Sequence, residues 1–174
     1  MLTVRDIHPT EIVRLSEITL AAYEALDIDV GSYRTALADV ADRARNAEVL
    51  VAVDGGRLLG GVTYVPDANN PSAEFDDADA AGMRMLAVDP AAQGRGVGAA
   101  LVTACIRRAH DRRRLVLHTT AAMTAAQQLY RRLGFERTPR RDRTPQPHVH
   151  LLGYELRLPA VADPRPQLRR SVGE

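Results

Sequence analysis

Residues 84–99 read Arg-Met-Leu-Ala-Val-Asp-Pro-Ala-Ala-Gln-Gly-Arg-Gly-Val-Gly-Ala. A compact apolar run at 83–88 has the length of a buried strand, Asp89-Pro90 closes it, and a helix is predicted over about 96–110. Unpaired backbone N–H groups gather where a helix begins, and glycines let an oxygen approach them closely. The helix dipole adds partial positive charge at the same point. Residues 89–99 therefore predict a loop that binds a diphosphate.

Two other phosphate-binding motifs do not fit this spacing. A Walker loop needs Gly-Lys-Ser/Thr at the start of the helix, and the chain contains no lysine. The dinucleotide fingerprint is met literally by Gly94, Gly96 and Ala99, but it belongs directly at the end of a strand and is followed by an acid about 20 residues later. About 20 residues after the glycines the chain has His118 and no acid nearby. An NAD-binding oxidoreductase therefore remains only as an alternative.

The rest of the chain alternates between apolar strand patterns and amphipathic helices. Strands are predicted at 2–7, 48–53, 58–65, 83–88, 114–118 and 151–158. Helices are predicted from Pro9, over 32–47, over 96–110, and from a cap at Thr120 or Thr124 to 133, where Gly134 ends the last helix. Residues 67–80 are acidic and show no period, as a loop does. The order of elements predicts a mixed α/β sheet with helices on its faces.

Composition narrows the class of protein. The 174 residues are 45% hydrophobic and 26% charged, which is typical of one globular domain, here expected at 1–158 with a polar tail at 159–174. The single cysteine excludes an internal disulfide, and the absence of lysine excludes a Schiff-base mechanism. No apolar run approaches the ~18 residues of a membrane span. We expect a cytoplasmic protein whose partners are neither membranes nor nucleic acids.

Three motifs, in order, carry a resemblance to a known family. They are Arg84-Met-Leu-Ala-Val-Asp-Pro90, then Gln93-x-x-Gly96-x-Gly98, then Leu129-Tyr-Arg-Arg-Leu-Gly-Phe135. Over about residues 81–136 the chain resembles the GCN5-related N-acetyltransferase (GNAT) family. The resemblance implies a mixed α/β fold with a mostly antiparallel central sheet, splayed strands and flanking helices. It also implies acetyl-CoA as co-substrate and direct attack by an amine, without a covalent enzyme intermediate.

The same resemblance implies a set of residues that hold the cofactor. The backbone of the apolar run would bind the pantetheine arm, and the amides of the glycine-rich loop would bind the pyrophosphate. The expected cofactor-binding residues are Leu86, Ala87, Val88, Gln93, Gly94, Arg95, Gly96, Val97, Gly98 and Ala99. No metal ligand is expected, because His148 and His150 share one face of an extended segment with no third ligand in view.

Tyr130 is the candidate catalytic residue. Acyl transfer expels a thiolate whose conjugate acid has a pKa of about 8.5, and a phenol with a pKa of about 10 can donate a hydrogen bond to it as the general acid. The alternative is a core aromatic, because Tyr130 shares a helical face with Ala126 and Leu133.

The chain departs from the family pattern at two positions. Met123 stands where many members carry an asparagine that contacts the cofactor, and Gly82 stands where many carry a glutamate that helps deprotonate the amine. A protonated amine cannot attack a carbonyl, so the proton needs another acceptor. The nearby candidates are Glu74, Asp76, Asp77, Asp79 and His118.

Two groups of charged residues each allow two interpretations. The acidic loop either attracts a cationic amine or is simply solvated. The arginines at 137, 140, 141 and 143 either reach the 3′-phosphate of the cofactor or form a surface cluster.

The sequence thus predicts an N-acetyltransferase that acts on a primary amine, expected to be that of a small molecule. The alternatives are an enzyme that acetylates a protein N-terminus or lysine, and a non-catalytic sensor of coenzyme A. By resemblance, the two N-terminal helices, at about 9–47, line the acceptor site, where Tyr23 and Tyr33 are candidate contacts. Dimers are common in this family, so a homodimer is one arrangement that the resemblance allows.

Overall fold

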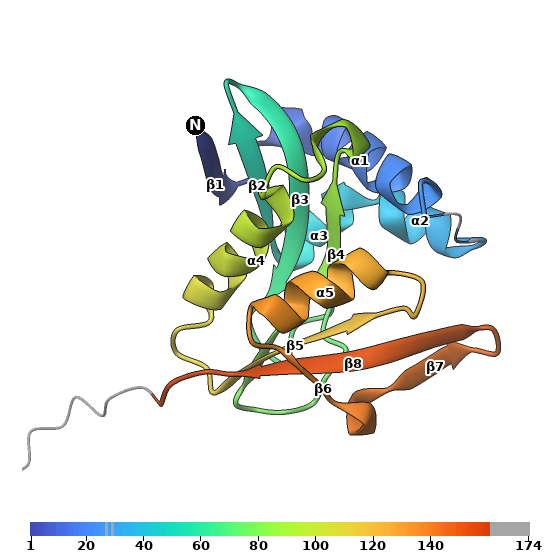
Figure 1. Cartoon of the computed structure of the whole chain (residues 1–174), viewed down its shortest axis with the longest axis vertical. Helices are drawn as coiled ribbons and strands as arrows, with labels where there is room; N and C mark the ends of the chain where they lie inside the picture. Colours follow the sequence, from blue (N-terminus) through green and yellow to red (C-terminus); the bar gives the residue numbers. More distant parts are fainter. Residues whose placement is uncertain (27, 29, 161–174) are drawn as a thin grey trace, which may run out of the picture.

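The computed structural model describes residues 1–26, 28 and 30–160, and the expected tail at 159–174 therefore lies almost wholly outside the described residues. Its sheet has eight strands in the order β1-β2-β3-β4-β5-β8-β6, with β7 beside β8 (Figure 1). The strands are β1 (Leu2–Asp6), β2 (Glu48–Asp54), β3 (Arg57–Val65), β4 (Ala80–Val88), β5 (Arg114–Thr119), β6 (Glu136–Arg137), β7 (Arg143–Gln146) and β8 (Val149–Arg157). The helices are α1 (Ile12–Glu24), α2 (Tyr33–Ala38), α3 (Val40–Asn46), α4 (Val97–Arg108) and α5 (Thr124–Arg132), with short 3-10 turns at Pro9–Glu11, Pro90–Ala92 and Pro139–Arg141.

Helices cover both faces of the sheet, as the alternation of side chains along β2 shows. Val49, Val51 and Val53 point to one face and pack with α1 and α3, whereas Leu50 and Ala52 point to the other face and pack with α4. Figure 1 shows α4 in front of the sheet and α1 and α3 behind it. The predicted mixed α/β class with a mostly antiparallel sheet is confirmed, because β4 and β5 are the only parallel pair among the described strands.

All predicted strands are present, but the helix expected over 32–47 is wrong: the structure has two helices there. Asp39 breaks it, with φ −83° and ψ 63°, and its carboxylate accepts a hydrogen bond from the Asp42 N–H at 2.9 Å to cap α3. The Arg43 guanidinium donates to two carbonyls at the end of α2. Side chains therefore satisfy both ends of the break, and helical periodicity alone does not reveal such partners.

The α5 helix ends as predicted, at Gly134. This glycine has φ 94°, and its N–H donates to the Arg131 carbonyl at 3.1 Å. The Phe135 N–H donates to the Tyr130 carbonyl at 3.0 Å, and the two rings lie 5.7 Å apart. The pattern is a Schellman motif with its apolar contact, and it anchors the turn of α5 that carries Tyr130.

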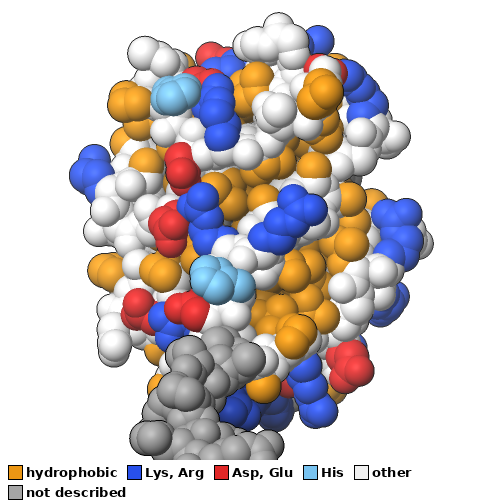
Figure 2. Space-filling view, turned by 90° about the vertical axis from the view of Figure 1, so that its left-hand side faces the viewer, with side chains coloured by type: hydrophobic (Ala, Val, Ile, Leu, Met, Phe, Trp, Pro, Cys, Tyr) orange, Lys and Arg blue, Asp and Glu red, His pale blue; other side chains and the backbone are white. Residues whose placement is uncertain are grey.

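Figure 2 shows the side of the molecule on which α4 and the amino terminus lie. On this face, arginines are interspersed with carboxylates and with a hydrophobic area. Ion pairs of this kind join α4 to the edge of the sheet, since Arg108 lies 2.8 Å from both Asp6 and Glu48. Among the described residues, no helix is long and apolar enough to cross a membrane.

Candidate active site

The strands β4 and β5 separate part of the way along their length. Their parallel pairing is limited to Ala80–Met83 of β4 and Arg114–Leu117 of β5. Beyond Met83, β4 continues beside β3, while β5 continues beside β8. The splayed strands that the resemblance implies are therefore present, and their backbone edges face a gap.

A bulge in β4 accompanies this separation. The register between β3 and β4 shifts between Gly61 and Thr63, opposite Met85, which has φ 52° and is the only non-glycine residue with positive φ in the described part of the chain. This conformation costs about 1–2 kcal/mol for a residue with a side chain. Strain of this kind often accompanies a site that needs a special backbone geometry.

The bulge leaves the end of β4 in position to bind an extended ligand. The Asp89 N–H donates to the Leu59 carbonyl of β3 at 2.8 Å, so alternate residues along β4 point the same way. The backbone groups of Ala87 are therefore directed to β3, and those of Val88 are directed away from it, towards the gap. Contacts of Leu86, Ala87 and Val88 with the pantetheine arm stay a prediction.

The glycine-rich loop connects this strand end to α4. Gly94 and Gly96 both have φ 77°, and the ideal Cβ position of each has no atom within 4 Å. Gly96 is the N-cap of α4, and the first hydrogen bond within the helix runs from the Ala100 N–H to its carbonyl at 3.0 Å. The N–H groups of residues 97–99 therefore have no acceptor within the helix. An open turn with free amides at a helix N-terminus suits a pyrophosphate.

Two other predicted cofactor-binding residues lie beside this loop. Gln93 is exposed between the 3-10 turn and the first glycine. The Arg95 guanidinium donates to the Asp54 carboxylate at 3.1 Å, and Asp54 also binds the amino terminus. In this structure Arg95 is thus paired with the β2–β3 turn, and its cofactor role stays a prediction.

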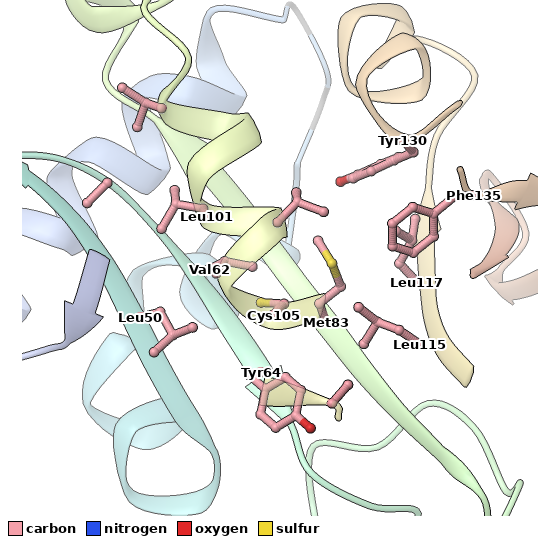
Figure 3. Close-up of a cluster of buried hydrophobic side chains, with 14 of the residues drawn as sticks. Leu50, Val62, Tyr64, Met83, Leu101, Cys105, Leu115, Leu117, Tyr130 and Phe135 are labelled. Atoms are coloured by element: carbon pink, nitrogen blue, oxygen red, sulfur yellow. The ribbon is translucent and has the colours of Figure 1, made fainter. Parts of the chain in front are cut away.

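Tyr130 faces a cavity at the gap between the strands. The cavity has an empty volume of about 330 Å³, and its polar lining side chains include Tyr23, Arg84, His118, Thr119 and Tyr130 itself. Tyr130 is 4% exposed, and Figure 3 shows its hydroxyl oxygen pointing away from Phe135. Within the described residues, this hydroxyl has no hydrogen-bond partner. Burial raises the pKa of Tyr130, so the hydroxyl keeps its proton at neutral pH.

Met123 and the threonines around it differ from expectation. Met123 is the N-cap of α5 and makes no side-chain capping bond, so the predicted cap by Thr120 or Thr124 is wrong. The Thr119 hydroxyl instead contacts the Met123 sulfur at 3.3 Å, and the Gln127 amide donates to the Thr120 carbonyl at 2.9 Å. Met123 lines the cavity, which replaces a polar family position with an apolar wall.

The acidic loop is tied to arginines. Glu74 lies 2.9 Å from Arg84, Asp77 lies 2.6 Å from Arg141, and Asp79 lies 3.4 Å from Arg114. These three carboxylates are therefore ion-paired and still partly solvated, and attraction of a cationic amine by the loop stays a prediction.

The arginines at 137, 140, 141 and 143 also have carboxylate partners, one of them in β8. Arg140 and Arg141 both bind Glu155, at 2.8 and 2.9 Å, Arg137 binds Asp142 at 2.6 Å, and Arg143 lies 3.8 Å from Glu74. These ion pairs stabilise the part of the chain that contains β6, β7 and β8. Of these three strands, the sequence predicts only β8.

The two histidines of the β7–β8 hairpin are not part of the cavity. His148 and His150 are exposed, and the His150 Nδ1 lies 3.3 Å from the Thr144 hydroxyl. In the part of the chain that the structure describes, no three His, Cys, Asp or Glu side chains are grouped to hold a metal.

Phe75 fills the space beside Gly82. A Cβ added at Gly82 would lie 2.5 Å from the Phe75 ring, so the position that is often glutamate in the family has no room for a side chain here. We expect Gly82→Ala to lower the free energy of unfolding by about 1–3 kcal/mol through overpacking, measured by chemical denaturation.

The matched control for that substitution is the same change in a Phe75→Leu background. Leucine is smaller, so the penalty of Gly82→Ala is expected to shrink there. A neutral effect of Gly82→Ala in the wild-type background would show that Phe75 does not occupy this space in solution.

A gap between two parallel strands, an open glycine turn at a helix N-terminus and a buried phenol together suit an acyl-CoA-dependent transferase. A sequence model described as "Acetyltransferase (GNAT) family" matches residues 12–135, which is more than half of the chain. The chain belongs to the acetyltransferase (GNAT) family. The resemblance that the three motifs carry is thereby confirmed, and enzymes of this family use acetyl-CoA as co-substrate.

Individual relatives agree with this assignment. The mycothiol acetyltransferase of Cellulomonas flavigena is 37% identical in an alignment 110 positions long, with coverage of 55% of this chain and 30% of that protein. The chain thus spans less than a third of that relative's length. A GNAT-family acetyltransferase from Staphylococcus aureus Mu50 has a similar fold, with a TM-score of 0.74, 16% identity and coverage of 91% of this chain and 100% of that one. The structure of yncA from Salmonella typhimurium, solved with acetyl-CoA, has a TM-score of 0.67 at 20% identity, covering 94% and 98% of the two chains.

Proposed function

We propose that this protein transfers the acetyl group of acetyl-CoA directly to the primary amine of a small molecule. The observation that carries the proposal is the Tyr130 hydroxyl, which has no hydrogen-bond partner among the described residues and lies at a cavity between two separated strands. Tyr130 supplies the proton that the departing thiolate needs. The backbone of Leu86 and Val88 holds the pantetheine arm, and the amides that follow Gly96 hold the pyrophosphate.

The residues present fit acetyl-CoA. The turn has free amides and open space on the side of its glycines, which is what a pyrophosphate requires. When bound, acetyl-CoA supplies an acetyl group activated as a thioester. The chain orients this group through the edge of β4, keeps water from it with the apolar wall of Met83, Leu117 and Met123, and protonates the leaving sulfur from Tyr130.

The enclosure of the cavity supports a small acceptor. Side chains from α1, β4, β5 and the α5 region all line it, so it is a concave site walled by several elements. Concave sites of this kind are typical of small-molecule ligands, whereas a folded protein surface needs an open groove.

A panel of four amines tests this proposal. Tyramine, glucosamine, spermidine and an alanyl peptide would be incubated with acetyl-CoA and the protein, with thiol release and the mass of the product as readouts. We expect turnover of at least one of the three small amines and slower turnover of the peptide.

Two outcomes would redirect the proposal. A preference for the peptide indicates a protein acetyltransferase. Tight binding of acetyl-CoA with no acetylated product from a broader panel of primary amines indicates a coenzyme A sensor.

A further inference from the structure

His118 and Tyr130 line the same cavity. His118 lies on β5, and Tyr130 lies on α5. His118 is the next-to-last residue of β5, its side chain is 7% exposed, and it lines both this cavity and a smaller one beside Gly82 and Phe75. No other residue type in the larger cavity can accept a proton near neutral pH.

The hydrogen bond of the His118 ring determines which of its nitrogens can accept a proton. The His118 Nε2 lies 2.7 Å from the Arg141 carbonyl oxygen, which can only accept, so Nε2 carries a proton and donates. The neutral ring therefore has its lone pair on Nδ1. Arg141 is itself held by Glu155 at 2.9 Å and by Asp77 at 2.6 Å, so the carbonyl that orients the ring sits on a fixed segment.

The carboxylate of Glu74 faces the free nitrogen. The His118 Nδ1 lies 3.6 Å from Glu74 Oε2, while the other oxygen of Glu74 lies 2.9 Å from Arg84. The remaining charged groups that act on the ring are Arg141, Arg143 and Asp142. Burial, the largest effect, lowers the pKa of His118, and the hydrogen bond to the Arg141 carbonyl and the Glu74 charge partly oppose it. The ring is thus neutral at neutral pH, with an anion placed to stabilise it once it is protonated.

We propose that His118 Nδ1 accepts the proton that the acceptor amine loses, and that Glu74 is a positioning residue that stabilises the resulting imidazolium. This inference rests on the proposed function and explains how the chain works with Gly82 in place of an acid. The acidic loop brings Glu74 to the same part of β4, because Phe75 packs on Gly82 and Glu74 pairs with Arg84.

The proton balance of the reaction is complete with these two groups. The ammonium gives one proton to Nδ1, and its freed lone pair forms the C–N bond to the acetyl carbon. The C–S bond breaks, and the thiolate takes the proton of Tyr130. The nitrogen loses its second proton as the amide forms, which restores the phenol, and the imidazolium returns its proton to water. One ammonium and one thioester give one amide, one thiol and one proton.

The kinetic test is His118→Gln, assayed with the best amine of the four-member panel. Glutamine keeps an N–H that can donate to the Arg141 carbonyl but has no basic nitrogen. We expect kcat/KM at neutral pH to fall by about 10²–10⁴-fold, with acetyl-CoA affinity unchanged. The deficit should shrink about tenfold per pH unit towards the pKa of the amine, because the free amine then needs no base.

The matched control is His110→Gln, an exposed histidine just beyond the end of α4, which is expected to leave the rate and its pH profile unchanged. A second measurement does not depend on turnover. Long-range proton–nitrogen NMR of the protein labelled at histidine is expected to show His118 as the Nε2–H tautomer. Glu74→Gln is expected to lower the pKa of His118 further, since the Glu74 charge raises it.

The outcomes separate this inference from the function on which it rests. Normal turnover by His118→Gln at neutral pH, or an Nδ1–H tautomer, overturns the proton-acceptor role and leaves the acetyltransferase proposal standing. Wild-type protein that binds acetyl-CoA but acetylates no amine overturns both.

Discussion

Gly96→Glu is expected to weaken acetyl-CoA binding by about 10²–10⁴-fold, measured by calorimetric titration. The turn loses the hydrogen bonds from its amides to a charged group, each worth about 1.5–3 kcal/mol, and gains a carboxylate next to the pyrophosphate. Gly96 has φ 77°, so any side chain there is strained as well, and its Cβ points into open space where the ligand is expected. The altered anion contacts and the backbone strain both weaken the binding of acetyl-CoA. This is therefore the largest expected change in affinity.

The control for this substitution separates strain from loss of the anion site. Gly55→Glu introduces the same charge at another positive-φ glycine, with φ 55° and open space around its Cβ position, in the turn between β2 and β3. We expect both variants to lose similar stability, and only Gly96→Glu to lose binding. Equal loss of binding in the two variants would contradict the assignment of the turn.

Tyr130→Phe is expected to lower kcat by about 10²–10³-fold while the affinity for acetyl-CoA changes little. The substitution removes only the hydroxyl, and the packing of the ring on Phe135 and Tyr154 is retained. Because burial raises the pKa of Tyr130, the phenol stays protonated well into the alkaline range. Wild-type activity should therefore not decline through ionisation of this group between about pH 8 and pH 10.

Tyr64→Phe is the matched control, because it removes a hydroxyl from another buried tyrosine of the same core (Figure 3). Burial also raises the pKa of Tyr64, so the two residues share that property and differ in their access to the cavity. An unchanged kcat in Tyr130→Phe would return Tyr130 to the role of a core aromatic.

The local parts of the site were predictable from the sequence. The diphosphate turn depends on glycines spaced over a few residues at a helix start, and the structure places Gly94 and Gly96 in left-handed conformations there. The end of α5 was equally predictable, because a glycine that terminates a helix and the aromatic residue that follows it form a local motif. The roles of these residues in cofactor binding stay predictions.

The long-range parts were not predictable. The contacts of Glu74 with Arg84 and His118 join a loop to β4 and β5, and no local pattern signals which carboxylate of an acidic run reaches inward. The packing of Phe75 on Gly82 is hidden for the same reason. The break at Asp39 depends on partners that helical periodicity does not report, and β6 and β7 are too short or too polar to show a strand pattern.

The most direct test of the central claim is calorimetric titration of the wild-type protein with acetyl-CoA, coenzyme A and NAD. Micromolar binding of acetyl-CoA and coenzyme A, with no binding of NAD at the same concentrations, is the predicted result. Binding of NAD alone, or of none of the three, would contradict the assignment of the glycine turn and of the gap between β4 and β5 as an acetyl-CoA site.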